Sequence, residues 1–142
     1  MKYQIAAAIG LAASLLIAPA GADELDGAFV REHANEMLEG ALTQEQTDSL
    51  GLIAYQVAAA AACEGVALDP AKFETVFARL TPVDAEKMSD AQKAYFDQHL
   101  LVIYGVMVGG ALATFSDDTA AKCETARKAK DDPGLADDLV WQ

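Results

Sequence analysis

The chain has 142 residues, of which 22 are Asp or Glu and 10 are Lys or Arg, giving a formal net charge of −12 at pH 7. So acidic a surface argues against binding to nucleic acid or to anionic lipid head groups, because both need clustered cations. The acidic residues are spread along the chain, which is typical of a charge that keeps a protein soluble.

The first 22 residues have the pattern of a cleaved export signal. Lys2 precedes a largely apolar stretch, Ile5 to Ile17, that is too short to span a bilayer comfortably. The motif APAGA follows and offers cleavage after Ala20 or after Ala22. We therefore expect a bacterial Sec-type signal over residues 1–22 and a periplasmic or secreted mature protein. A retained N-terminal anchor is the alternative.

The predicted mature chain, residues 23–142, has the length of one domain with a modest core. It contains two cysteines, Cys63 and Cys123, and an even pair in an oxidising compartment usually forms a disulfide. Neither belongs to a C-x-x-C motif, which argues against a thioredoxin-like redox site, and the absence of C-x-x-C-H excludes covalent c-type haem. In the chain-entropy account, closing a loop of roughly 60 residues stabilises the fold by about 4 kcal/mol. The sequence therefore predicts a structural disulfide.

The mature sequence consists of capped helical segments, and no period-two stretch bounded by hairpin turns predicts a strand. The first predicted helix covers Asp26–Glu39 and stops at Gly40. Thr43 and Gln46 then form a capping box. It opens a helix to about Glu64 whose second half, VAAAAAC, has almost only small side chains.

The next predicted helix begins at Asp69, an N-cap residue, with Pro70 in the first helical position. Its apolar residues follow the spacing of one buried helix face: Phe73, Val76, Phe77 and Leu80. Thr81 and Pro82 repeat the same arrangement and predict about two further helical turns.

Another capping box, Ser89 with Gln92, opens the longest predicted helix. Asp117 or Asp118 then caps a last helix that ends at about Lys130. Residues 131–142 are predicted to be a short tail. Its apolar residues, Trp141 among them, suffice for one docking turn, and an exposed Trp141 that anchors a partner is the alternative. The fold class expected is all-α: a single-domain bundle of four to six helices stapled by one disulfide.

The segment His99–Phe115 contains sixteen consecutive residues without a charge after its histidine. A helix that is apolar on every side must be enclosed by protein or by lipid. Sixteen residues rise only about 24 Å, short of a hydrocarbon core of about 30 Å. A single span would also place Cys63 and Cys123 on opposite sides of the membrane. We therefore expect enclosure within a soluble bundle. The alternative is a membrane-anchored accessory subunit held by residues 100–115, which the four cations downstream would favour.

Small residues within this segment form a helix-packing groove. Gly105, Gly109 and Ala113 recur every four residues and allow a second helix to approach closely. The alanine run 58–62 is the complement within the same chain, and our hypothesis is that the two helices cross there at short distance. A homodimer interface is the competing use of the groove.

No catalytic constellation stands out, and we predict a protein that is not an enzyme and that needs no cofactor or metal. His33 and Glu36 give H-x-x-E, the reverse of the order in di-iron bundles, and only once. No G-x-S-x-G motif is present. A helical bundle that binds haem or metal is the alternative, with axial ligands from His99 and a methionine. The methionines considered are Met37, Met88 and Met107.

In architecture alone, a small exported helical protein with two cysteines is similar to periplasmic acid-stress chaperones and to small immunity proteins that neutralise a toxin. The function expected is therefore non-enzymatic and exercised through binding to another protein, whose identity the sequence does not supply. Nucleic acid is not an expected partner.

Overall fold

A computed structural model describes residues 33–142 except residues 35 and 39. Within this part the chain forms four α-helices, α2 (Gln44–Ala62), α3 (Pro70–Phe77), α4 (Asp90–Asp117) and α5 (Thr119–Lys130), together with a short 3-10 helix, η1 (Ala85–Lys87). No strand occurs among these residues. The predicted all-α bundle with one disulfide is confirmed at this level. The predicted signal segment and most of the predicted helix over residues 26–39 lie outside the described residues.

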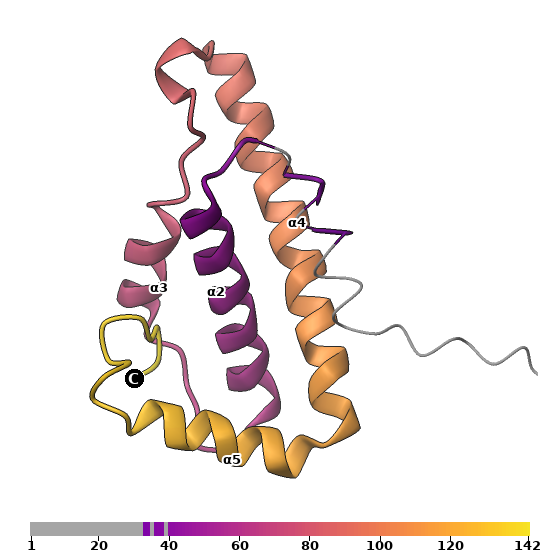
Figure 1. Cartoon of the computed structure of the whole chain (residues 1–142), viewed down its shortest axis with the longest axis vertical. Coiled ribbons are helices and arrows are strands. Elements are labelled where there is room, and N and C mark those ends of the chain that lie inside the picture. The colour runs from indigo at the N-terminus through magenta and orange to yellow at the C-terminus, as the bar shows by residue number, and fades with distance from the viewer. Residues whose placement is uncertain (1–32, 35, 39) are drawn as a thin grey trace, which may run out of the picture.

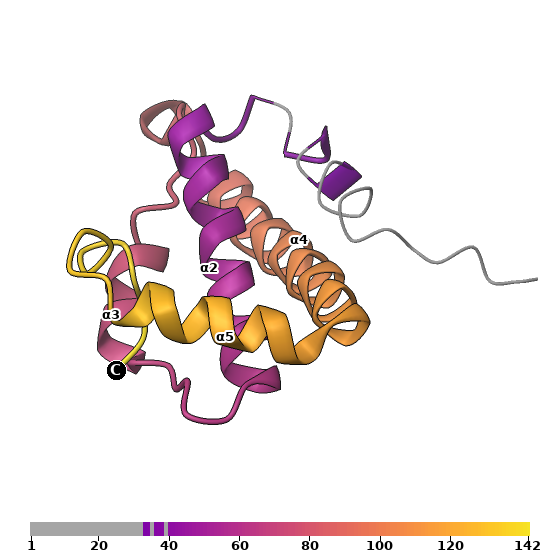
Figure 2. The same cartoon turned by 60° about the horizontal axis from the view of Figure 1, so that its bottom comes forward.

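Helix α2 lies at the centre of the bundle, between α3 and α4 (Figure 1). Helices α2 and α4 run in the same direction, and α5 crosses the C-terminal ends of both. Viewed from that end, α5 lies in front of the other helices and leads into the C-terminal tail beside α3 (Figure 2). The long helix α4 therefore has neighbours on some of its faces and not on others.

Both predicted capping boxes are confirmed, which explains why α2 and α4 begin where they do. The Gln46 N–H donates to the Thr43 hydroxyl at 3.2 Å, and the Thr43 N–H donates to the Gln46 side-chain oxygen at 2.9 Å. Ser89 and Gln92 repeat the pair at 3.3 and 2.8 Å. These bonds satisfy N–H groups that have no partner within the helix. The Gln46 side-chain amide also donates to the carbonyls of Arg79 and Thr81. This residue therefore connects the start of α2 to the loop that follows α3.

The predicted caps of α3 and α5 are confirmed as well. The Asp69 carboxylate accepts from two N–H groups in the first turn of α3. Asp118, rather than Asp117, caps α5 by accepting from Ala121 at 3.1 Å. The two turns predicted after Pro82 are wrong, because only the three residues of η1 are helical there. The N–H of Val83 donates instead to a carbonyl ahead of α2, and η1 has no side-chain cap.

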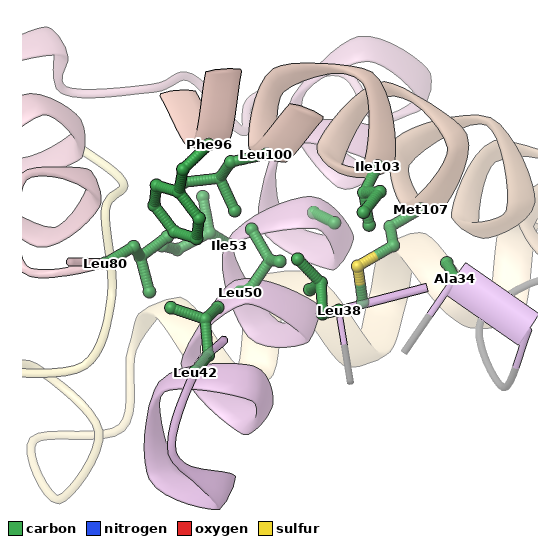
Figure 3. Packing of buried hydrophobic residues seen from close by; sticks show 11 residues of the cluster. Ala34, Leu38, Leu42, Leu50, Ile53, Leu80, Phe96, Leu100, Ile103 and Met107 are labelled. Atoms are coloured by element: carbon green, nitrogen blue, oxygen red, sulfur yellow. The ribbon is translucent and has the colours of Figure 1, made fainter. Parts of the chain in front are cut away.

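The larger apolar core forms where α2 and α4 face each other (Figure 3). Leu50 and Ile53 of α2 are buried against one face of α4. Residues from the segment before α2 and from the end of the α3 region close the same core. Its buried side chains are Ala34, Leu38, Leu42, Leu50, Ile53, Ala54, Leu80, Phe96, Leu100, Ile103 and Met107. The face predicted for α3 is confirmed in position: Leu80 is buried, and Phe73, Val76 and Phe77 pack against this core.

A second core surrounds the disulfide, at the end of the bundle where α5 crosses α2 and α4. Cys63 and Cys123 are bonded, with a Cα–Cα distance of 5.3 Å, and both are buried. The alanine run of α2 contributes here, because Ala58 and Ala59 are fully buried. The remaining buried members are Val66, Ala111, Phe115, Ala126, Leu139 and Trp141. The predicted structural disulfide is confirmed, and it fastens the end of α2 to α5.

Candidate interaction surface

Helix α4 buries one face and exposes the opposite one. Its buried side chains, Phe96, Leu100, Ile103 and Met107, follow the spacing of a single helix face turned towards α2. Large apolar side chains nevertheless remain on the opposite side. Their exposed fractions are 56% for Leu101, 60% for Val102, 41% for Val106 and 38% for Leu112. The prediction that this helix is enclosed on every side is therefore wrong for the described residues.

The small residues of the predicted groove lie on this exposed side. Gly105, Gly109 and Ala113 are all exposed, and a Cβ atom added to either glycine would meet no other group within 4 Å. The seven residues concerned are called the outward face of α4 from here on. They are Leu101, Val102, Gly105, Val106, Gly109, Leu112 and Ala113.

The hypothesis that the alanine run of α2 fills this groove is wrong. Ala58 and Ala59 pack instead in the cluster that contains Ala111 and Phe115, on another side of α4. The physical reason is the amount of apolar surface available. The side of α4 that carries Phe, Leu, Ile and Met removes more apolar area from water against α2 than the opposite side could, because three of the seven residues on that opposite side are Gly or Ala.

The outward face carries no charge. Residues 98–116 contain no Asp, Glu, Lys or Arg. The charged residues of α4 lie near its ends, at Asp90, Lys93, Asp97 and Asp117. A helix at the surface of a soluble protein normally turns charged residues outwards. The outward face of α4 is therefore an apolar strip on a chain that is otherwise strongly acidic.

By length and composition α4 is the one helix among the described residues that is long and apolar enough to cross a membrane. A third of its most apolar stretch of 18 residues is buried inside the bundle. A core helix of a soluble protein meets the same criterion. Aromatic side chains of α3 reach the middle of α4, where the Phe77 ring meets the Tyr104 ring at 5.3 Å. The exposed Lys72 and Glu74 of α3 would then enter the bilayer too, which is costly.

The aromatic contact between α3 and α4 also affects Tyr104. Its ring packs against Phe77 edge-on and against Phe73 at 6.1 Å. Partial burial in this apolar surrounding disfavours the phenolate and raises the pKa of Tyr104 above its ordinary value. Tyr55, whose ring lies 5.3 Å from that of Phe115, has its pKa raised for the same reason. Both tyrosines act here as packing residues.

The C-terminal tail is docked, as the first of the two interpretations of Trp141 predicted. Trp141 is 2% exposed, and it forms an isolated antiparallel bridge with Leu68. Residues 139–142 therefore dock in extended form, after turns within residues 131–138. The residue that receives the tail, Gln56, is fully buried in the middle of α2 and was not predicted from the sequence. A glutamine within the apolar half of a helix is the signal that could have identified it.

Of the methionines considered as haem ligands beside His99, Met37 lies next to its ring and Met107 lies apart from it. Met107 is buried in the apolar core, whereas the ring of His99 stacks on Tyr95 at 5.6 Å and its Nε2 lies 3.3 Å from the Met37 carbonyl oxygen. His99 and Met107 are separated by about 12 Å along the axis of α4, too far to coordinate one iron from opposite sides. Met37 and His33 are exposed. Across the described residues, no group of three or more His, Cys, Asp or Glu side chains could hold a metal ion.

A shallow opening of about 360 Å³ lies between α3 and the tail, lined by Lys72, Arg79 and Asp137 among others. The ammonium group of Lys72 donates to the Trp141 carbonyl at 3.0 Å, so it serves to hold the tail. The charged groups that line this opening are two cations and one carboxylate, which do not make up a set of nucleophile, base and orienting group.

Comparison with protein-family models, with curated proteins and with solved structures finds no match to this chain.

Proposed function

We propose that this chain is an exported, non-enzymatic protein that acts by binding another protein through the outward face of α4. The observation that carries the proposal is the exposure of Leu101, Val102, Val106 and Leu112 on a strip without charge. Exposed apolar patches of this kind mark interaction surfaces, because soluble proteins otherwise avoid them. The lack of side chains at Gly105 and Gly109 allows close approach of a partner backbone.

Export is part of the proposal and has two supports. The signal-like segment 1–22 is one. The buried disulfide between Cys63 and Cys123 is the other, since such bonds persist mainly in oxidising compartments. The N-terminal residue of the protein recovered from outside the cytoplasm tests this directly. We expect Gly21 or Asp23, whereas an intact Met1 would refute cleavage.

The proposed binding surface is tested by thiol accessibility in intact cells. Gly109→Cys places a thiol on the outward face of α4, where a Cβ atom has open space, and Ala71→Cys places one on the exposed side of α3 as the control. A small maleimide should modify the cysteine at position 109 at least about tenfold more slowly than the one at position 71, which corresponds to occupancy near 90%. In urea the two should react alike. Equal rates in cells would refute the proposal.

A membrane-anchored subunit is the second candidate, favoured by the length and apolarity of α4. An alkaline carbonate wash distinguishes it, because a protein held by a membrane-spanning helix stays with the membrane pellet and a soluble protein does not. Protection of position 109 together with retention in the pellet would support the membrane candidate. Protection together with release supports protein binding.

A further inference from the structure

We infer that the outward face of α4 is covered by a second copy of this chain, so that the protein forms a symmetric dimer through α4. The inference rests on the proposed function, since it names the partner of the same surface. It is carried by three properties of that face: its lack of charge, its alternation of small and large residues, and its size.

The charge distribution selects among partners. A basic protein would be recognised through carboxylates, and the outward face presents none. An anionic lipid surface would repel a chain of net charge −12, whose α4 has Asp90 and Asp97 near one end and Asp117 at the other. Two copies in contact through this face bring only uncharged side chains together, so no carboxylate has to be desolvated. Two such acidic molecules therefore repel each other least when they meet through the outward face of α4.

The shape of the face is complementary to itself. Gly105 and Gly109 carry no side chain, and nothing lies within 4 Å of where their Cβ atoms would be, so a second helix can approach the backbone there. Exposed side chains of Leu101 and Leu112 stand at the two ends of this stretch, and Val102 and Val106 stand along its edge. In a two-fold dimer each patch meets its own copy, so the large side chains of one helix can pack over the glycines of the other. A flat or wholly convex helix face would not offer this fit.

The small size of the outward face indicates that the dimer is weak. The charge-free stretch 98–116 is about 28 Å long, and the contact is one helix wide, so the interface belongs at the low end of specific interfaces, below about 1,200 Å² in total. We therefore expect a dimer that dissociates on dilution, with a dissociation constant on the order of 10 µM.

Sedimentation velocity of the oxidised mature protein between about 1 and about 200 µM tests the inference, since this range brackets the expected constant. The mass should rise from one chain to two. Raising the salt concentration should strengthen association, because it screens repulsion between two acidic copies, whereas an interface of ion pairs would weaken. Salt-induced dissociation would therefore contradict the proposed interface.

Two variants locate the interface. Val102→Glu and Gly105→Glu each place a carboxylate on the outward face of α4 and should give one chain at every concentration. Ala71→Glu adds the same charge on α3, away from this face, and should dimerise like the wild type. Circular dichroism should show unchanged helix content in all three, since each site is exposed. A dimer that survives both α4 substitutions, or falls apart with Ala71→Glu, would overturn the inference.

The outcome also separates this inference from the proposed function. A wild-type protein that remains a single chain at about 200 µM, well above the expected constant, overturns the dimer. If the thiol at position 109 is still protected in cells in that case, the face binds a different protein and the proposed function stands. If that thiol is fully accessible in cells and the purified protein is a single chain, both proposals fail.

Discussion

The side-chain oxygen of Gln56 accepts a hydrogen bond of 2.6 Å from the backbone N–H of Val140, and both residues are fully buried. The same side chain donates to the Asp138 carbonyl at 3.0 Å, and the Gln56 carbonyl accepts from the Trp141 indole at 2.9 Å. The middle of α2 thus holds the C-terminal tail through three bonds. The tail in turn bridges to Leu68, ahead of α3, so one buried amide organises contacts among segments far apart in the sequence.

Replacing Gln56 by Leu should therefore destabilise the fold. The substitution leaves the Val140 N–H and the Asp138 carbonyl without their partner, and an unsatisfied buried group costs about 1–3 kcal/mol, so the total expected is about 2–4 kcal/mol. Urea unfolding followed by circular dichroism measures it. Gln44→Leu, at an exposed position of the same helix, is the control and should change little. A Gln56→Leu protein as stable as the wild type would show that the two side-chain bonds of Gln56 to the tail contribute nothing.

The tail should also loosen separately from the bundle. Trp141 is the only tryptophan of the chain, so its fluorescence reports on the tail alone. In Gln56→Leu the emission should shift to longer wavelength at a lower urea concentration than the loss of helix. The tail has then lost its two bonds to the Gln56 side chain and, of its bonds to this position, keeps only the one from the indole to the carbonyl of residue 56. Coincident transitions would mean that the tail and the helices unfold as one unit.

Reduction of the disulfide between Cys63 and Cys123 should lower stability by about 4 kcal/mol, since the bond closes a loop of roughly 60 residues in the unfolded chain. The loop contains α3, α4 and the start of α5, so most of the bundle benefits. Urea unfolding with and without reductant measures the change. The double variant Cys63→Ala with Cys123→Ala should be destabilised and should show no further response to reductant. An unchanged midpoint on reduction of the wild type would contradict this expectation.

Stability should fall at alkaline pH through the two partly buried tyrosines. Burial raises the pKa of Tyr104 and of Tyr55 above the ordinary value of 10.0. Below pH 10 both folded and unfolded chains keep these protons, so these tyrosines add no pH dependence. Above pH 10 the unfolded chain releases protons that the folded chain retains, and stability declines until the folded pKa is passed.

Urea unfolding at a series of pH values from 8 to 11 measures this decline. Tyr104→Phe keeps the ring against Phe77 but cannot ionise, so its decline should be shallower than that of the wild type. Absorbance of the phenolate at alkaline pH provides an independent measure, since the variant should lose one late-titrating group. If Tyr104→Phe declined as steeply as the wild type, Tyr104 would not contribute.

Much of the local structure follows from residues that act on their immediate neighbours. Thr43 with Gln46 and Ser89 with Gln92 mark helix starts correctly because a capping box involves only four consecutive positions. The prediction of two helical turns after Pro82 is wrong because a contact from outside the local sequence decides the structure there. There the N–H of Val83 is taken by a carbonyl from a distant part of the chain, and a bond of this kind has no signature in the local sequence.

Which side of α4 packs against α2 could not be predicted from the sequence either. Its central part is apolar on nearly every side, so sequence periodicity could not say which side meets α2. The expectation that the glycines would pack inside rested on their small size. The structure places the larger side chains of Leu100, Ile103 and Met107 inside and leaves Gly105 and Gly109 exposed. The sequence therefore identifies Gly105, Gly109 and Ala113 of the candidate surface, whereas its four large apolar residues and its exposure could not be foreseen.

A matched pair of substitutions distinguishes the observed packing from the predicted one. Gly109→Ala should raise the stability of the dilute protein by about 0.5–1 kcal/mol, because a helical glycine is replaced by a better helix former where a Cβ atom has open space. Ala59→Leu should lower it by about 1–3 kcal/mol, since Ala59 is fully buried and the extra atoms overpack the core. Thermal unfolding at a concentration below that of self-association measures both. If the glycines faced the core, Gly109→Ala would instead destabilise, and if Ala59 lay at the surface, its replacement by leucine would cost almost nothing.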